Sequence, residues 1–227
     1  MVGECSEFRL VLDGQRQHWS RVYAGDSDFF GEAPSYAARK VVGLLKAEGK
    51  LRVLELGAGQ GRDAFFFAGE GFGVVALDYS EKAVEAMVQR ARRVKFAGSF
   101  EAVCHDVREA LPFADGSFDV CYCHMLYCMA LCSRELEALF REVWRVLKPG
   151  GLSVYTVRHT GDPHYGRGFH CGEDLYENGG FVVHFFSREK VLQLAKGYEI
   201  LGIEEFEEGE LPRKLFLVTL RKKPLFE

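Results

Sequence analysis

The sequence predicts an α/β fold, doubly wound around a mostly parallel, seven-stranded sheet with an antiparallel last strand. Apolar runs of strand length alternate with segments of helix length, a pattern typical of a parallel sheet covered by helices on both faces. The last two apolar runs are separated only by the short turn EGELPR, so we expect them to pair as a hairpin. Three glycines within Gly57–Gly61 follow the first strand, where open α/β sheets bind their ligands.

The predicted elements begin and end at residues suited to those places. Pro34 suits the first turn of the first predicted helix, and Gly49 suits its exit. Ser80 is the expected N-cap of a later helix, because the acidic Glu81 follows it in the first turn. The predicted strands are residues 51–57, 73–78, 100–106, 118–124, 152–159, 198–207 and 214–222. The predicted helices are residues 33–49, 62–71, 80–94, 133–148 and 187–197.

We divide the chain into two parts. Residues 1–32 are aromatic and charged, show no clear period, and are expected to form an irregular lid that leads into the main domain at 33–227. Within that domain, a polar insert at 159–180 follows the fifth strand. A loop of this length inside a compact domain is usually functional, so we expect the insert to lie on the substrate side.

Composition narrows the possible partners and surroundings. The net charge is −4, with 29 basic and 33 acidic residues, which is not the basic field of a nucleic-acid-binding protein. The seven cysteines are an odd number, so we expect no disulfide framework and a cytoplasmic location. The N-terminus lacks the apolar core of a signal peptide, and no apolar run reaches membrane-spanning length, so we expect no membrane partner.

The spacing of the glycine turn separates the ligands that it could bind. A dinucleotide fold needs G-x-G-x-x-G, but here the third glycine comes one position early and Arg62 stands where glycine is required. A P-loop is excluded because no Gly-Lys-Ser/Thr follows the turn. The turn therefore suits a ligand that approaches the backbone closely without a phosphate to neutralise.

Five ordered motifs resemble those of class I S-adenosylmethionine-dependent methyltransferases. They are VLELGAGQGRD, VVALD, HDV, LPFADGSFDVCYCHML and EVWRVLKPGGLSVYTV. The resemblance implies S-adenosyl-L-methionine as cofactor, with Glu55 facing its methionine end, Asp78 its ribose hydroxyls and Asp106 its adenine amino group. The cofactor-binding residues implied in this way are Tyr23, Glu55, Gly57, Ala58, Gly59, Gly61, Asp78, Tyr79, Asp106, Val107, Tyr122 and Cys123.

The acceptor pocket is expected at the ends of the fourth to sixth strands. His124 and His159 follow strand ends and are candidates for proton handling, although a structural, hydrogen-bonded histidine explains each equally well. The chain is most similar to the tellurite- and thiopurine-type members, whose last turn implies an acceptor-binding role for Arg213. The expected substrate-binding residues are Phe30, His164, Tyr165, His170 and Tyr176.

The expected function is methyl transfer from S-adenosylmethionine to a small molecule. Alternatives are a protein or RNA methyltransferase, and a regulatory module that binds the cofactor without catalysis. No metal is expected, because His159, His164, His170 and Cys171 do not match a zinc-ligand spacing.

Overall fold

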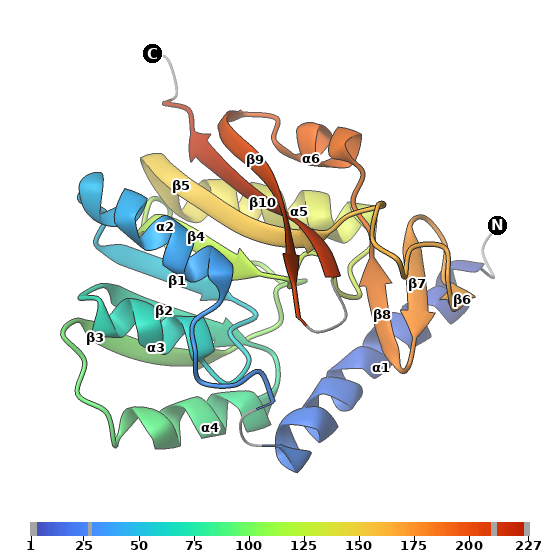
Figure 1. The fold of residues 1–227 in the computed structure, drawn as a ribbon, viewed down its shortest axis with the longest axis horizontal. Coiled ribbons are helices and arrows are strands. Elements are labelled where there is room, and N and C mark those ends of the chain that lie inside the picture. Colours follow the sequence, from blue (N-terminus) through green and yellow to red (C-terminus); the bar gives the residue numbers. More distant parts are fainter. Residues whose placement is uncertain (1–3, 27–28, 210–212, 225–227) are drawn as a thin grey trace.

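The computed structural model describes residues 4–26, 29–209 and 213–224, with side chains from residue 14 onward. Seven strands form one sheet in the order β3-β2-β1-β4-β5-β10-β9 (Figure 1). They are β1 (Arg52–Leu56), β2 (Gly73–Asp78), β3 (Ser99–Cys104), β4 (Phe118–His124), β5 (Leu147–Arg158), β9 (Tyr198–Glu208) and β10 (Arg213–Lys222). Strands β1 to β5 run parallel, whereas β10 is antiparallel to both β5 and β9. The predicted sheet and its antiparallel last strand are therefore confirmed.

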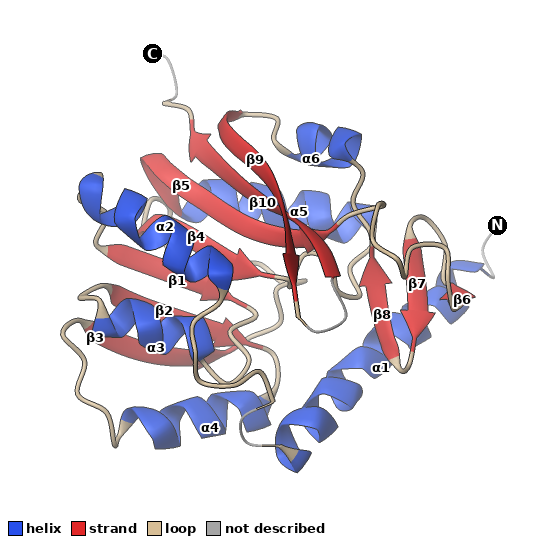
Figure 2. Ribbon diagram, viewed as in Figure 1, coloured by secondary structure: helices blue, strands red, loops and turns tan. Residues whose placement is uncertain are grey.

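Helices cover both faces of this sheet (Figure 2). The helices are α1 (Glu4–Gly25), α2 (Tyr36–Ala47), α3 (Arg62–Gly69), α4 (Glu81–Ala91), α5 (Ser133–Val146) and α6 (Arg188–Leu194). Side chains of α2, α3 and α4 form one buried cluster with Val53, Val120 and Tyr122, while α5 and α6 form another with Leu54 and Cys121. Consecutive strand residues thus point into opposite cores, as expected of a sheet buried on both faces.

The strand order places the binding edge at the centre of the sheet. The chain runs from β1 to β2 and β3 on one side of β1 and then crosses to β4 on the other side. The carboxyl ends of β1 and β4 therefore flank a crevice at the topological switch point, the usual ligand site of such folds. The Gly57–Gly61 turn lies at this point.

The N-terminal segment differs from its prediction. Residues 4–25 form the regular helix α1, which packs against α4 and β8, instead of an irregular lead-in. Large residues are spaced as in a helix, but polar residues between them hide the pattern. Trp19 and Tyr23, for example, lie one turn apart and stack on each other at 5.5 Å. Within the described part of the chain, none of the helices combines the length and hydropathy that crossing a bilayer requires.

The insert also has more structure than the predicted loop. It contains a second, three-stranded antiparallel sheet made of β6 (Phe169–His170), β7 (Leu175–Asn178) and β8 (Phe181–His184). Because β8 pairs along its whole length with β7, this unit extends past residue 180 to His184. Figure 1 shows α1 running beside this small sheet at the carboxyl edge of the main one.

Candidate functional site

The glycine turn is held against the end of β2. The amides of Gly57 and Ala58 donate to the Leu77 carbonyl at 2.8 and 3.0 Å, and the Gly59 amide donates to Asp78 Oδ2 at 2.8 Å. A side chain is disfavoured at two of these positions. A Cβ on Gly57 would lie 2.8 Å from Leu126 Cβ, and one on Gly59 would lie 3.0 Å from Tyr23 Oη, both at positive φ.

Asp78 is a buried carboxyl group at the strand end. Its other oxygen, Oδ1, accepts the Ser80 amide at 2.9 Å, while Ser80 caps α4 through its own hydroxyl, as predicted. Burial raises the pKa of Asp78 to about 6, although the Ser80 and Gly59 amides partly offset that effect. A desolvated carboxyl held in this way is suited to accepting hydrogen bonds from a ligand.

Glu55 supplies a second buried carboxyl group near the glycine turn. The residue is 3% exposed, and its Oε2 has no hydrogen-bond partner among the described residues. Burial, and secondly the charge of Asp63, raises its pKa well above the ordinary value. An unpartnered buried carboxyl oxygen indicates a missing partner, and a cationic ligand group would supply it.

Asp63 organises a network that the sequence analysis did not identify. It accepts hydrogen bonds from the Ser35 amide at 2.7 Å, the Ser35 hydroxyl at 2.6 Å and the Tyr122 hydroxyl at 2.9 Å. Tyr122 therefore directs its side chain into the core between the sheet and α3, where it packs on Phe67. Cys123 points into the opposite core. These two side chains, proposed from the sequence to bind cofactor, lie in the protein interior.

Aromatic side chains from α1, the loop after it and the start of β8 cluster over the turn. Trp19 stacks on Tyr23 and also contacts Phe29, Phe30 and Phe181 at centroid distances of 5.1 to 6.4 Å. We call these five residues the aromatic lid. Gln60 ties the lid to the glycine turn, because its side chain accepts the Phe29 amide at 3.1 Å. Tyr23 and Phe30, both predicted site residues, thus lie on one structure next to the glycine turn.

The far end of the site is formed by the ends of β2 and β3. Asp106 follows β3 and is bound by Arg108, whose Nη2 lies 2.7 Å from its Oδ2. Burial raises the pKa of Asp106, but the Arg108 bonds outweigh burial and leave it below the ordinary value. Val107 is buried in the core cluster that contains α5. Tyr79 is itself largely buried, which raises its pKa above the ordinary value. A cavity of about 600 Å³ opens nearby between α1 and the start of α4.

His124 lies at the end of β4 with both ring nitrogens engaged. Its Nδ1 is 3.0 Å from Thr156 Oγ1, and its Nε2 is 3.1 Å from Glu208 Oε2. Leu126, two residues further on, is the side chain nearest Gly57. His124 therefore lies at the carboxyl end of the sheet, and its role in proton handling stays a prediction.

The other two predicted catalytic residues occupy different surroundings. His159 stacks on Phe216 at 4.5 Å, and its Nδ1 accepts the Gly161 amide at 3.0 Å. Burial lowers its pKa, so the ring is neutral at pH 7 and serves the turn after β5. Arg213 is exposed at the start of β10, paired in register with Glu208.

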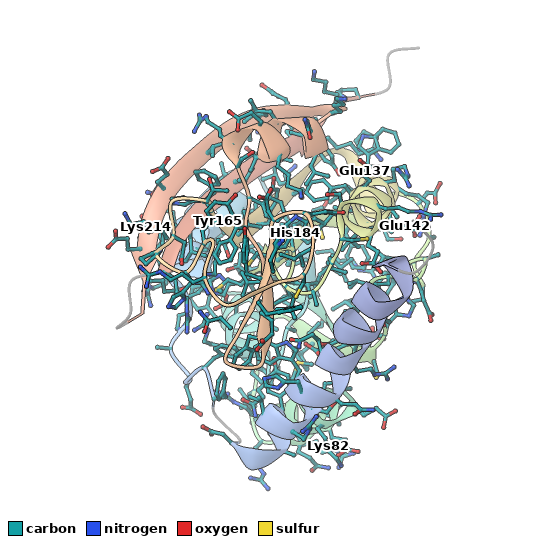
Figure 3. The ribbon with its side chains drawn as sticks, turned by 90° about the vertical axis from the view of Figure 1, so that its right-hand side faces the viewer. Lys82, Glu137, Glu142, Tyr165, His184 and Lys214 are labelled. Carbon is teal, nitrogen blue, oxygen red and sulfur yellow. The ribbon has the colours of Figure 1, made fainter. Side chains whose placement is uncertain are left out.

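The predicted substrate residues of the insert form two groups. His164 Nδ1 is 2.7 Å from Arg158 Nη2, whose guanidinium is paired with the buried carboxylate of Asp162. Tyr165, His170 and Tyr176 form an aromatic cluster with centroids 4.9 to 5.5 Å apart. Figure 3 shows Tyr165 and His184 within the insert, between Lys214 of β10 and helix α5. In the described ranges, no three His, Cys, Asp or Glu side chains form a metal-binding group.

A glycine turn with strand-end carboxylates at the switch point defines a Rossmann-like cofactor-binding protein. Comparison with known proteins makes this more specific. The family described as Methyltransferase domain matches residues 53–151. Residues 53–151 therefore form a class I S-adenosylmethionine-dependent methyltransferase domain.

The names of individual relatives give different methylated atoms, carbon in one and sulfur in another. The chain is 32% identical over 141 residues to "Thiol S-methyltransferase TMT1B" of Homo sapiens, covering 61% of this chain and 54% of the relative. It is 33% identical over 154 residues to "24-methylenesterol C-methyltransferase 2" of Oryza sativa subsp. japonica, covering 65% and 41%. The chain spans about half the length of these curated relatives or less.

A solved structure agrees over nearly the whole chain. The 1,6-didemethyltoxoflavin-N1-methyltransferase of Burkholderia thailandensis superposes with a TM-score of 0.73, covering 96% of this chain and 90% of that one. At 20% identity this likeness establishes the fold.

Proposed function

We propose that this protein transfers the methyl group of S-adenosylmethionine to a small-molecule acceptor. The observation that carries the proposal is the cradle formed by the Gly57–Gly61 turn, Asp78 and Glu55 at the switch point. The two carboxyl groups match a ligand that has a ribose diol and an ammonium group. The unpartnered Oε2 of Glu55 supports this match. A buried carboxyl oxygen without a partner is costly, and the ammonium group of the ligand would supply that partner.

The chain's own residues bind, orient and exclude water. Asp78 is proposed to accept from the ribose hydroxyls, Glu55 to pair with the ammonium group, and Asp106 to accept from the adenine amino group. When bound, the cofactor supplies a methyl group on a positively charged sulfur. The aromatic lid keeps water away from the site, and its ring faces favour a cation. Positioning of the acceptor then supplies most of the rate enhancement.

The acceptor side is proposed to lie between the ends of β4, β5 and β9 and the insert. Phe30, His124 and Glu208 come from different elements that meet there: Arg62 lies under the Phe30 ring at 5.9 Å, and its charge also acts on Glu208. A small molecule suits this region because α1 and the insert cover it. Gln15 of α1 bonds the Gly180 carbonyl at 3.0 Å and accepts from the Val182 amide at 3.2 Å.

Methyl-labelled S-adenosylmethionine tests the proposal directly. Wild-type protein is incubated with thiols, amines, carboxylates and metalloid oxyanions, and in parallel with peptides and RNA. We expect label on at least one small molecule and none with Asp78→Asn. Label found only on peptide or RNA would refute the small-molecule proposal. Cofactor binding without transfer to any acceptor would favour the regulatory alternative.

A further inference from the structure

Three side chains from three strands form a continuous hydrogen-bonded chain beside the glycine turn. Thr156 of β5 lies 3.0 Å from His124 Nδ1, and His124 Nε2 lies 3.1 Å from Glu208 at the end of β9. The Thr156 hydroxyl also accepts the Met125 amide at 3.0 Å. Exposure increases along the chain: Thr156 is fully buried, and the side chains of His124 and Glu208 are 13% and 22% exposed.

The hydrogen-bond pattern engages both ring nitrogens of His124. Nδ1 shares a hydrogen bond with the Thr156 hydroxyl. A carboxylate can only accept, so Nε2 carries a hydrogen and donates it to Glu208. With both nitrogens engaged, His124 has no free lone pair for a substrate proton. Its role is to orient the carboxylate, which makes it a positioning residue.

Glu208 is held as an anion by groups from three elements packed against it. These are the His124 ring from β4, the Arg62 charge from α3, and the backbone amide of Tyr36 at the start of α2. Burial raises the pKa of Glu208, but these groups outweigh burial and leave it below the ordinary value. A carboxylate has about four lone-pair positions, so these bonds leave capacity on its exposed side.

We propose that Glu208 selects the acceptor, favouring molecules that carry an ammonium group or another N–H donor over anionic ones. This inference rests on the proposed methyltransferase function and specifies the substrate class of the same site. The ammonium group is a recognition group and need not be the methylated atom. If the acceptor loses a proton in the reaction, that proton passes to solvent water. Glu208 orients the acceptor and is not required as its base.

Arg213 is a cation close to Glu208 in the sheet, and it would favour anionic acceptors instead. It is paired in register with Glu208, and the sequence analysis assigned it to an acceptor-binding role, which would favour a carboxylate or oxyanion. The structure leaves Arg213 on the exposed surface, whereas Glu208 is bonded to His124 beside the glycine turn. A charge interaction is stronger where water is excluded. The partly buried Glu208 is therefore expected to affect acceptor binding more than the exposed Arg213 does.

Two probes of similar shape and opposite charge test this selection. Benzylamine and benzoate are titrated separately into protein loaded with S-adenosylhomocysteine, and the affinity of each is measured by calorimetry. We expect wild type to bind benzylamine at least about tenfold more tightly than benzoate, the gain typical of one charge-assisted bond. Glu208→Gln should remove that preference, whereas Glu207→Gln, the exposed neighbour, should keep it. His124→Leu should weaken the preference more than His124→Gln, which retains a donor.

The outcomes separate the two proposals. Equal or tighter binding of benzoate to wild type, no binding of benzylamine, or a preference that survives Glu208→Gln would each overturn the role of Glu208. Binding of S-adenosylhomocysteine is measured first in the same samples. Its absence, with the amine preference intact, would count against the methyltransferase proposal alone.

Discussion

Asp78 is predicted to lower the stability of the cofactor-free protein at neutral pH, because its buried position at the end of β2 must hold a desolvated carboxylate. The perturbation is Asp78→Asn, which keeps the size and removes the charge. Burial raises the pKa of Asp78 from 3.8 to about 6. A raised carboxyl pKa means that the folded state binds the proton more tightly, so its stability contribution is present at low pH and lost as pH rises through 3.8 to 6. The variant lacks this loss.

The magnitude follows from the two pKa values. Between pH 4.5 and 8, wild type should lose about 2 kcal/mol of unfolding free energy relative to Asp78→Asn. The hydrogen bond that Asn loses to the Gly59 or Ser80 amide costs the variant the same at both pH values, so it cancels in this comparison.

Urea unfolding of both proteins at pH 4.5 and 8, without cofactor, measures the effect. Other titrating groups are shared by the two proteins and cancel as well. Stability differences that stay constant with pH would refute the burial argument. A wild type that gains on the variant as pH rises would show that the site stabilises the carboxylate instead.

Three further substitutions test other parts of the structure. Asp162→Asn leaves the guanidinium of Arg158 buried without its anion and should lower the free energy of unfolding by about 3–5 kcal/mol in urea titrations. Gly59→Ala places a Cβ at positive φ against the lid and should cost about 1–2 kcal/mol, whereas Gly43→Ala, in open space on α2, should be neutral or stabilising. Gln15→Ala removes two bonds between α1 and the insert, so hydrogen exchange in α1 should become faster while that of β1 stays unchanged. Unchanged stability in the first two variants, or unchanged exchange in the third, would contradict the corresponding contact.

Much of the main sheet was predictable because its signals are local. Strand β2 ends at Asp78 and β4 spans Phe118–His124, both as predicted, because each apolar run is bounded by turn residues. The glycine spacing likewise indicates the binding turn without any knowledge of distant contacts. The hydrogen bond from the Gly59 amide to Asp78 connects two of these local signals.

Helix α1 was missed for a physical reason. Asp13, Gly14 and Arg16 interrupt its apolar spacing, and its stability comes from packing on α4 and β8. The available signal was the placement of Trp19 and Tyr23 one helical turn apart. Tertiary packing therefore decided the structure of a segment whose own sequence pattern is weak.

The roles of the candidate histidines depend on contacts between distant segments. His159 stacks on Phe216 of the last strand, and His124 bonds Glu208 at the end of β9. Their positions after strand ends were visible in the sequence, but their partners were not. The same holds for Tyr122, whose hydroxyl is bound by Asp63 from α3.

Calorimetric titration with S-adenosylmethionine tests the central claim most directly. Wild type is compared with Asp78→Asn and with Asp115→Asn, a control whose side chain is 81% exposed and pairs with Arg145. We expect one binding site in wild type and in the control, and affinity at least about tenfold weaker in Asp78→Asn, since hydrogen bonds to a charged group are lost. No binding by wild type, or equal binding by all three proteins, would contradict the cofactor site described here.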